Sequence, residues 1–280
     1  MYTTLVSAQE LKDCLGNSNC LVIDCRFNLA DTAAGELAYQ QAHIPNAFYL
    51  HLDRDLSSPI TPLSGRHPLP APEMLSATLQ QCGVSSSSQI VVYDDCGGMM
   101  AARCWWLLRW LGHQSVAVLN GGLPAWVDAG FPIETDIPCS AKGDFVGCTN
   151  SDAYLSQTQL KTFQIGKDIQ LIDARAAERY AGKIEPIDPV AGHIPNALNR
   201  PLMDNLDGGF FKPAEQLRDE WLSVIDDVAP TDVVHMCGSG VTACHNLLAM
   251  EHAGLSGSRV YPGSWSEWIR DPQNPVTVGD

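Results

Sequence analysis

The sequence predicts an α/β fold that is a tandem duplication of one domain type. Each copy is expected to be a parallel sheet with helices on both faces. Three observations predict it. The length of 280 residues fits two domains of ordinary size. Several short motifs of the first half return in the second half in the same order. In both halves, apolar β-branched runs alternate with helix-length patterns.

Four repeated motifs carry the evidence for the duplication. With their second copies, they are LVIDCR at 21–26 (QLIDAR at 170–175), AHIPNAF at 42–48 (GHIPNAL at 192–198), IVVYDD at 90–95 (DVVHMC at 232–237) and LNGGLPAW at 119–126 (YPGSWSEW at 261–268). Residues 131–150, between the two sets, are rich in Pro, Gly and polar residues and lack helical periodicity. We therefore expect an N-terminal domain at 1–138, a linker at 139–150 and a C-terminal domain at 151–280.

Short apolar runs predict the strands, and longer amphipathic runs predict the helices. The expected strands are 20–24, 89–94 and 116–119 in the first half and 171–175, 232–237 and 257–263 in the second. The expected helices are 71–83, 102–113, 213–225 and 242–254. Gly112 and Gly254 are placed to end two of these helices, because glycine adopts the left-handed conformation that commonly follows a helix.

The composition excludes several classes of function. Asp and Glu outnumber Lys and Arg by 32 to 17, and nucleic-acid binding depends on Lys and Arg, so no nucleic acid is expected as a partner. No apolar run reaches the roughly 20 residues of a membrane span. The N-terminus does not resemble a signal peptide, so we expect a soluble, cytoplasmic protein with no membrane partner. Ten scattered cysteines without a C-x-x-C pair predict mainly buried thiols rather than disulfides or zinc ligands, and no metal or cofactor is expected.

Cys237 is the strongest candidate for catalysis. It ends a predicted strand, and the loop CGSGVT at 237–242 leads into the predicted helix 242–254. Ligands of open parallel sheets bind beyond the carboxyl ends of the strands. Gly238 and Gly240 allow the loop to turn its N–H groups inward, and the positive end of the helix dipole favours a thiolate there. The sequence therefore predicts a nucleophilic thiolate in an anion-binding loop.

Two chemistries suit such a loop. A cysteine phosphatase needs an arginine at position 243 to hold the phosphate oxygens, and this chain has Ala243. The other chemistry is attack of the thiolate on sulfane sulfur, which the loop N–H groups hold as a persulfide until an acceptor takes it. The sequence favours sulfur transfer.

Nearly the whole chain resembles the two-domain rhodanese-like sulfurtransferases. The resemblance rests on HIPNA in both halves, on WWLLRWLGHQSVAVLNGGLPAW at 105–126, on CGSGVTAC at 237–244 and on GSWSEW at 263–268. It implies a catalytic C-terminal domain and an N-terminal copy that lacks the active-site cysteine. Counting back from the two helix-end glycines places Asp95 opposite Cys237, with Cys96 one position later, so Cys96 is not expected to be a second nucleophile.

The loop itself resembles that of the 3-mercaptopyruvate sulfurtransferases. It contains no Lys or Arg, whereas a dianionic donor such as thiosulfate gains more from loop cations than a monoanionic carboxylate does. The resemblance implies an Asp, His and Ser relay that maps onto Asp53, His67 and Ser239 and moves the proton that the pyruvate enolate needs. The interval between Asp53 and His67 is a few residues longer than the family pattern.

Substrate binding is expected from the loop and from arginines. The loop contributes Gly238, Ser239, Gly240, Val241 and Thr242. The family's carboxylate-binding arginine maps onto Arg179. A second arginine, expected in an E-P-R segment, is missing, because EPIDPV has Ile187 and Asp188 there. Arg66, next to His67, is our candidate for supplying the missing charge.

These residues predict an enzyme, a sulfurtransferase that moves sulfur from 3-mercaptopyruvate to a thiophilic acceptor through a Cys237 persulfide. Two alternatives stay open. One is a thiosulfate:cyanide sulfurtransferase, and the other is a sulfur-relay or binding module that acts on a partner protein. The expected acceptors are cyanide, a small thiol or thioredoxin.

Several other motifs predict structure rather than chemistry. His43 and His193 of the HIPNA segments are expected to hold turns. Asp24 and Asp173 are expected to anchor the ends of strands. Cys244, in the helix after the loop, is expected to be buried.

Overall fold

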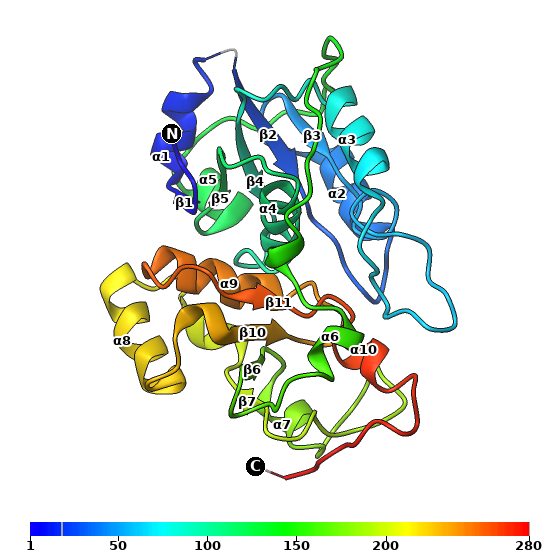
Figure 1. Cartoon of the computed structure of the whole chain (residues 1–280). Helices are drawn as coiled ribbons and strands as arrows, with labels where there is room; N and C mark the ends of the chain where they lie inside the picture. The colour runs from blue at the N-terminus through cyan, green and yellow to red at the C-terminus, as the bar shows by residue number, and fades with distance from the viewer. Residues whose placement is uncertain (18, 280) are drawn as a thin grey trace. The chain divides into compact units, whose positions relative to one another are not determined.

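The computed structural model of the chain describes residues 1–17 and 19–279. It divides into two compact units. The first contains residues 1–58 and 69–150, and the second contains residues 59–68 together with the chain from Ser151 onward. The segment 59–68 thus belongs to the second unit, although it precedes the linker in the sequence. Each unit has its own sheet and its own helices (Figure 1).

Among the described residues, the first unit has a five-stranded sheet in the order β1-β5-β4-β2-β3, with all neighbours parallel. Its strands are β1 (Leu5–Val6), β2 (Cys20–Asp24), β3 (Ala47–Tyr49), β4 (Gln89–Tyr93) and β5 (Val116–Leu119). Its helices are α1 (Ala8–Cys14), α2 (Ala34–Gln41), α3 (Pro72–Gln81), α4 (Ala101–Trp110) and α5 (Gly122–Asp128). Asp24 is paired with Tyr93, so β2 and β4 end side by side.

Both faces of this first sheet are covered. Side chains alternate between the faces along a strand. Val91 and Tyr93 pack in one cluster with α1 and with Trp126 of α5. Ile90 and Val92, which point the other way, are also fully buried, and α4 packs against β4 and β5.

The second unit repeats this plan in a smaller form. Its parallel sheet has four strands among the described residues, in the order β11-β10-β6-β7, and a separate antiparallel pair joins β8 to β9. The strands are β6 (Gln170–Asp173), β7 (Leu198–Asn199), β8 (Leu206–Asp207), β9 (Phe210–Phe211), β10 (Val233–Met236) and β11 (Arg259–Val260). The helices are α6 (Gln157–Leu160), α7 (Ala177–Tyr180), α8 (Ala214–Ile225), α9 (Ala243–His252) and α10 (Ser264–Trp268), with 3-10 turns at η1 (Ser151–Ala153), η2 (Leu202–Asn205) and η3 (Pro230–Asp232).

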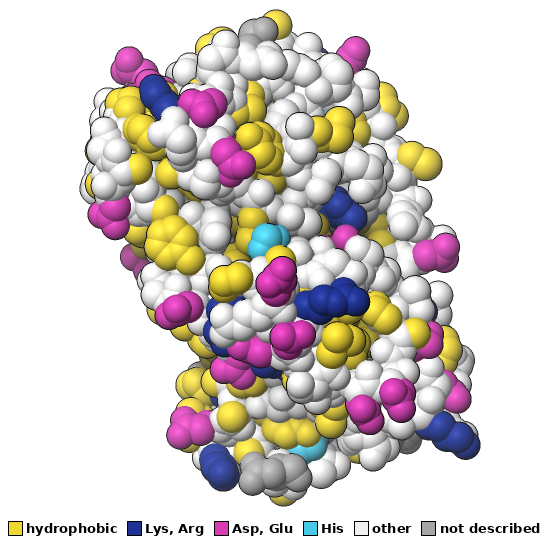
Figure 2. Space-filling view, turned by 90° about the vertical axis from the view of Figure 1, so that its left-hand side faces the viewer, with side chains coloured by type: hydrophobic (Ala, Val, Ile, Leu, Met, Phe, Trp, Pro, Cys, Tyr) yellow, Lys and Arg dark blue, Asp and Glu magenta, His cyan; other side chains and the backbone are white. Residues whose placement is uncertain are grey.

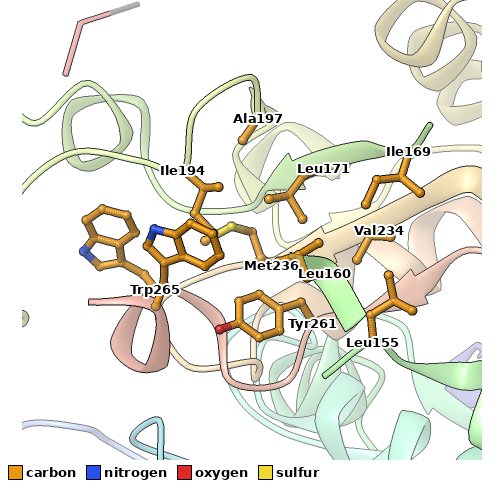
Figure 3. Close-up of a cluster of buried hydrophobic side chains, with 11 residues drawn as sticks. Leu155, Leu160, Ile169, Leu171, Ile194, Ala197, Val234, Met236, Tyr261 and Trp265 are labelled. Carbon is orange, nitrogen blue, oxygen red and sulfur yellow. The ribbon is translucent and has the colours of Figure 1, made fainter. Parts of the chain in front are cut away.

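The second core also occupies both faces of its sheet. One face holds the cluster drawn in Figure 3, in which Val234 and Met236 of β10 pack with Trp265 of α10. The alternate residue His235 points to the other face. There its ring meets the ring of Trp221 of α8 edge to face, with centroids 5.6 Å apart, and α9 packs on the same strand.

The predicted fold class is confirmed, since each unit is a parallel sheet with helices. The expected strands and helices are present, with ends that differ by a few residues. Gly112 and Gly254 follow α4 and α9 with φ of +88° and +72°, the left-handed conformation expected of helix-end glycines. Eleven described strands and helices were not predicted, namely β1, α1, α2, β3, α5, α6, α7, β7, β8, β9 and α10. Eight of them have only two to five residues, which carry too little periodicity, whereas α1, α2 and α5 have seven or eight residues.

One expectation about the cysteines is wrong. Cys14, at the end of α1, and Cys20, at the start of β2, form a disulfide. The pairing was missed because the cysteines were judged by compartment rather than by the short chain between them. Cys244 is buried, as expected, and neither Cys244 nor Cys237 takes part in a disulfide.

The described helices include none that is long and apolar enough to cross a membrane. Acidic and basic side chains are interspersed on the face drawn in Figure 2, and Lys and Arg form no large patch on that face. This distribution agrees with the formal net charge of −15.

Candidate active site

Cys237 lies in the loop between β10 and α9 (Figure 1), and its side chain is buried. Backbone hydrogen bonds tie this loop to the start of α10. The carbonyls of Cys237 and Gly238 accept from the N–H groups of Trp265 and Ser266. The Cys237 N–H donates to Ser264 Oγ at 3.1 Å. These bonds fix the backbone on both sides of the thiol.

Gly240 gives the loop its conformation. Its φ of +76° lies in the left-handed region, and a Cβ atom there would lie 2.1 Å from the carbonyl oxygen of Pro262, so no other residue fits. Its N–H donates to Cys237 Sγ at 3.2 Å. A backbone N–H aimed at the sulfur stabilises negative charge there, on a thiolate or on a persulfide.

His67 and Ser239 meet beside this loop, within the second unit. Nδ1 of His67 lies 2.7 Å from Oγ of Ser239, and both side chains are buried. The tautomer of the imidazole decides which of the two groups donates. The segment that carries His67 is held in place by the Arg66 N–H, which donates to Ser266 Oγ at 3.0 Å. The structure thus brings two of the three predicted relay residues together.

Asp53, the third predicted relay residue, lies in the first unit after β3. Its side chain is exposed, and its N–H donates to Nδ1 of His51 at 3.1 Å. His67 belongs to the second unit. The part of Asp53 in the relay therefore stays a prediction.

Two arginines face the loop at Gly238, the residue after Cys237. A Cβ atom on Gly238 would lie 3.0 Å from Nη2 of Arg66 and 3.7 Å from Nη2 of Arg179. Arg179 belongs to α7, and Arg66 comes from the segment 59–68. Their side chains are 21% and 16% exposed, so both guanidinium groups are partly open to solvent. This arrangement suits an anionic substrate next to Cys237.

Two buried carboxylates hold these arginines. Glu185 accepts from Nη2 of Arg179 at 2.7 Å and from its Nε at 3.2 Å. Asp188 accepts from Nη2 of Arg179 at 3.3 Å through one oxygen and from Nη1 of Arg66 through the other. Burial alone would raise the pKa of Glu185, but the hydrogen bonds from Arg179 and from two backbone N–H groups outweigh it and hold that pKa below its usual value.

Asp173 and Asp24 anchor the ends of equivalent strands, as predicted. Nη2 of Arg175 donates to Asp173 at 2.7 Å, and Nη2 of Arg26 donates to Asp24 at 2.6 Å. Each arginine also donates to the carbonyl of the residue that precedes the HIPNA segment. The two units therefore share one device that joins the strand end to the HIPNA turn.

The histidines of the HIPNA segments and Cys244 have the structural roles that were predicted. Nδ1 of His43 lies 2.7 Å from the Tyr39 carbonyl, and Nδ1 of His193 lies 2.8 Å from the Tyr180 carbonyl. Cys244 is buried in α9, where its thiol lies 3.4 Å from a carbonyl of the loop.

The first unit has a loop equivalent to that of Cys237, and the strand register identifies its first residue. Met236 pairs with Asp173, and Tyr93 pairs with Asp24, so the residue equivalent to Cys237 is Asp94. The count that placed Asp95 there is wrong by one. The Asp94 carboxylate accepts four backbone N–H groups, at 2.8 to 3.0 Å, from residues 96, 98, 100 and 101.

Cys96 is not equivalent to Cys237. Burial raises the pKa of its thiol well above the ordinary value, and the carboxylates of Asp94 and Asp95 raise it further. The sulfur therefore stays protonated at neutral pH, which agrees with the expectation that Cys96 is not a second nucleophile.

Three functional features were missed by the sequence analysis. Ser264 and Ser266 fix the loop and the segment that carries His67, and Asp188 joins the two arginines. The motif GSWSEW at 263–268 contained both serines, but it was used only for the family resemblance. The ion pair of Asp188 with Arg66 depends on the approach of a segment more than 100 residues away in the chain.

Comparisons with known proteins agree with this geometry. The family model described as the rhodanese-like domain matches residues 7–129 and again residues 156–271. The chain is 46% identical over 280 residues to a probable 3-mercaptopyruvate sulfurtransferase of Pseudomonas aeruginosa, with 99% of this chain and 98% of the relative covered. It is 32% identical over 293 residues to the thiosulfate sulfurtransferase of Mus musculus, with 100% and 97% covered.

A solved structure gives the same result. SseA from Escherichia coli, whose structure is described as that of a 3-mercaptopyruvate sulfotransferase, matches with a TM-score of 0.81 and 30% identity, and 95% of this chain and 100% of that chain are covered. The matches of the family model fall one in each half of the chain. The chain therefore belongs to the rhodanese family and carries two rhodanese-like domains.

Proposed function

We propose that this protein is a sulfurtransferase that moves sulfane sulfur from 3-mercaptopyruvate to a thiophilic acceptor through a persulfide on Cys237. The observation that carries the proposal is the geometry around the sulfur. A backbone N–H points at Cys237 Sγ, and two arginines face the next residue, where the anionic end of a donor would lie. The names of relatives that match nearly the whole chain support the same chemistry.

The sulfur-transfer step follows from these groups. The Cys237 thiolate attacks the donor sulfur, a new S–S bond forms, and the C–S bond of mercaptopyruvate breaks. The electron pair of that bond leaves on the enolate of pyruvate, which takes up a proton at carbon. Ser239, hydrogen-bonded to His67, delivers that proton. The acceptor then removes the outer sulfur and restores the thiolate.

The remaining assignments belong to the same proposal. Arg179 and Arg66 bind the donor carboxylate, and the loop residues 238–242 supply N–H groups around the sulfur. Asp53 orients His67 from the first domain. The domains are 1–138 and 151–280 with a linker at 139–150, and the location is the cytoplasm. The acceptor is cyanide, a small thiol or thioredoxin.

Thiosulfate is the second candidate donor. Two guanidinium groups next to Gly238 suit a dianion as well as a carboxylate, and several relatives are named thiosulfate sulfurtransferases. A role as a sulfur relay to a partner protein needs the same persulfide and is separated by the acceptor rather than by the donor.

Steady-state kinetics with each donor, on the wild type and on Cys237→Ala, test the proposal. We expect Cys237→Ala to lose at least about a thousandfold in kcat with both donors, because no persulfide can form. Cys139→Ala, which removes an exposed free thiol, is the matched control and should keep wild-type rates. Mass spectrometry after donor alone should show one added sulfur on wild type and none on Cys237→Ala. Retained activity in Cys237→Ala would show that the mechanism is wrong.

A further inference from the structure

Asp188 stands in the EPIDPV segment, where the family resemblance leads one to expect a cation. Its carboxylate is only 4% exposed, and its two oxygens bind two different arginines. One arginine, Arg179, comes from the neighbouring helix α7, and the other, Arg66, comes from the distant segment 59–68. A single buried carboxylate therefore joins the two cations that face the active-site loop.

The charges of this cluster offset one another. Arg66 and Arg179 contribute two positive charges beside Gly238, and Asp188 and Glu185 contribute two negative charges that bind them. Nε of Arg66 is buried and has no hydrogen-bond partner among the described residues. Both guanidinium groups are partly exposed, so the arginine pair is able to bind an anion, but the positive field at an entering donor is weaker than that of two unopposed guanidinium groups.

The carboxylate of Asp188 acts unequally on the two candidate donors. The energy of interaction between charges is proportional to their product, so a fixed negative charge repels a dianion about twice as strongly as a monoanion at the same position. At neutral pH, thiosulfate is a dianion and the carboxylate of mercaptopyruvate is a monoanion. A negative charge next to both arginines therefore selects against thiosulfate.

We propose that Asp188 is a specificity-determining residue, which lowers the positive charge of the Arg66–Arg179 pair so that a monoanionic carboxylate donor is used in preference to a dianionic one. This inference rests on the proposed function. Asp188 also positions the two side chains, so its charge has to be separated from its hydrogen bonds. Asp188→Asn removes the charge and keeps the size and one acceptor oxygen, and Asp188→Glu keeps the charge.

The test measures kcat/KM for 3-mercaptopyruvate and for thiosulfate in the wild type, in Asp188→Asn and in Asp188→Glu. For Asp188→Asn we expect an increase of about fivefold with mercaptopyruvate and about twenty-five-fold with thiosulfate, the square of the first factor, mainly through KM. The ratio of the two donors should thus move about fivefold toward thiosulfate. The change should shrink at high ionic strength, because the arginines are partly exposed. Asp188→Glu should keep the wild-type ratio.

Asp271→Asn is the control for charge alone. Asp271 is an exposed carboxylate of the second unit that pairs with Lys161, and its loss should leave the donor ratio unchanged. An equal loss of kcat/KM with both donors in Asp188→Asn would show a positioning role only and would overturn the inference. Persulfide formation on wild-type Cys237 is followed in parallel. If neither donor loads the sulfur, the proposed function itself fails, whereas loading with an unchanged donor ratio in Asp188→Asn defeats only the role of Asp188.

Discussion

The loops that begin at Cys237 and at Asp94 occupy equivalent positions in the two units, but the first residue of one is a cysteine and that of the other is an aspartate. One loop follows β10, which pairs with β6, and the other follows β4, which pairs with β2; β6 and β2 end in the aspartates that bind Arg175 and Arg26. In each loop, at least one backbone N–H is directed at the side chain of the first residue. In the second unit that side chain is a thiol, with one N–H directed at the sulfur. In the first unit it is a carboxylate that occupies four N–H groups.

This difference indicates that the two loops use their N–H groups differently. In the first unit, the chain's own carboxylate binds four N–H groups of the loop, including two at the start of α4, so those four donors are not available to an external anion. A loop with a thiol leaves the same kind of site to a sulfur atom that arrives from outside. The two loops therefore differ in what their N–H groups bind, which is the carboxylate of Asp94 in the first unit and the sulfur of Cys237 in the second.

Among the variants that test this comparison of the two loops, the largest effect is expected at Gly240. Gly240→Ala places a Cβ atom 2.1 Å from the Pro262 carbonyl, so the loop must move and its N–H must leave Cys237 Sγ. Loss of one oxyanion-type donor costs about a hundredfold to a thousandfold in kcat. Donor kinetics measure this loss.

Gly130→Ala is the matched control for Gly240→Ala. Gly130 has nearly the same dihedral, with φ +75°, but has no atom within 4 Å of an added Cβ. Its substitution should cost about 1 kcal/mol of stability, from the left-handed conformation alone, and leave the kinetics intact. Equal kinetic losses in the two variants would mean that the close approach at Gly240 does not matter.

The next effect concerns the loop that begins at Asp94 in the first unit. Asp94→Asn replaces one oxygen of the buried carboxylate by an NH2 group, so two of the four N–H groups lose their acceptor. We expect the free energy of unfolding to fall by about 1 to 3 kcal/mol, while sulfur transfer by the folded protein stays close to the wild-type rate. Urea unfolding followed by tryptophan fluorescence measures the first, and donor kinetics measure the second.

Asp95→Asn, one position along, is the control for that loop. The Asp95 side chain is exposed, and its substitution should change stability by less than about 0.5 kcal/mol. A similar loss of free energy of unfolding in both variants would contradict the assignment of the stabilising carboxylate to Asp94.

The comparison also shows what sequence can predict in this protein. Cys237, the glycine loop and the HIPNA turns were predictable, because local motifs and their repetition specify them. Asp94 was missed because the count assumed loops of equal length, whereas the helix begins at Ala101 in one loop and at Ala243 in the other, one residue closer. The pairing of Ser239 with His67 came only from the family pattern, and the ion pairs of Asp188 depend on tertiary contacts that no local pattern encodes.

The smallest expected effect concerns a difference between β10 and β4, the strands that precede the two loops. The register makes His235 of β10 equivalent to Val92 of β4. His235 is fully buried, neither ring nitrogen has a partner among the described residues, and burial lowers the pKa of the imidazole to about 3. Because that pKa lies below the unfolded value of about 6.5, the unfolded chain binds the extra proton as the pH falls. Stability conferred by the neutral ring is complete above pH 6.5 and is lost progressively toward pH 3.

His235→Val gives the second strand the residue of the first and removes this proton uptake. Between pH 7 and pH 5, the wild type should lose about 2 kcal/mol more of its free energy of unfolding than His235→Val does. Urea unfolding at both pH values, followed by tryptophan fluorescence, measures the difference. An identical pH slope in the two proteins would show that His235 does not stay neutral in the folded sheet.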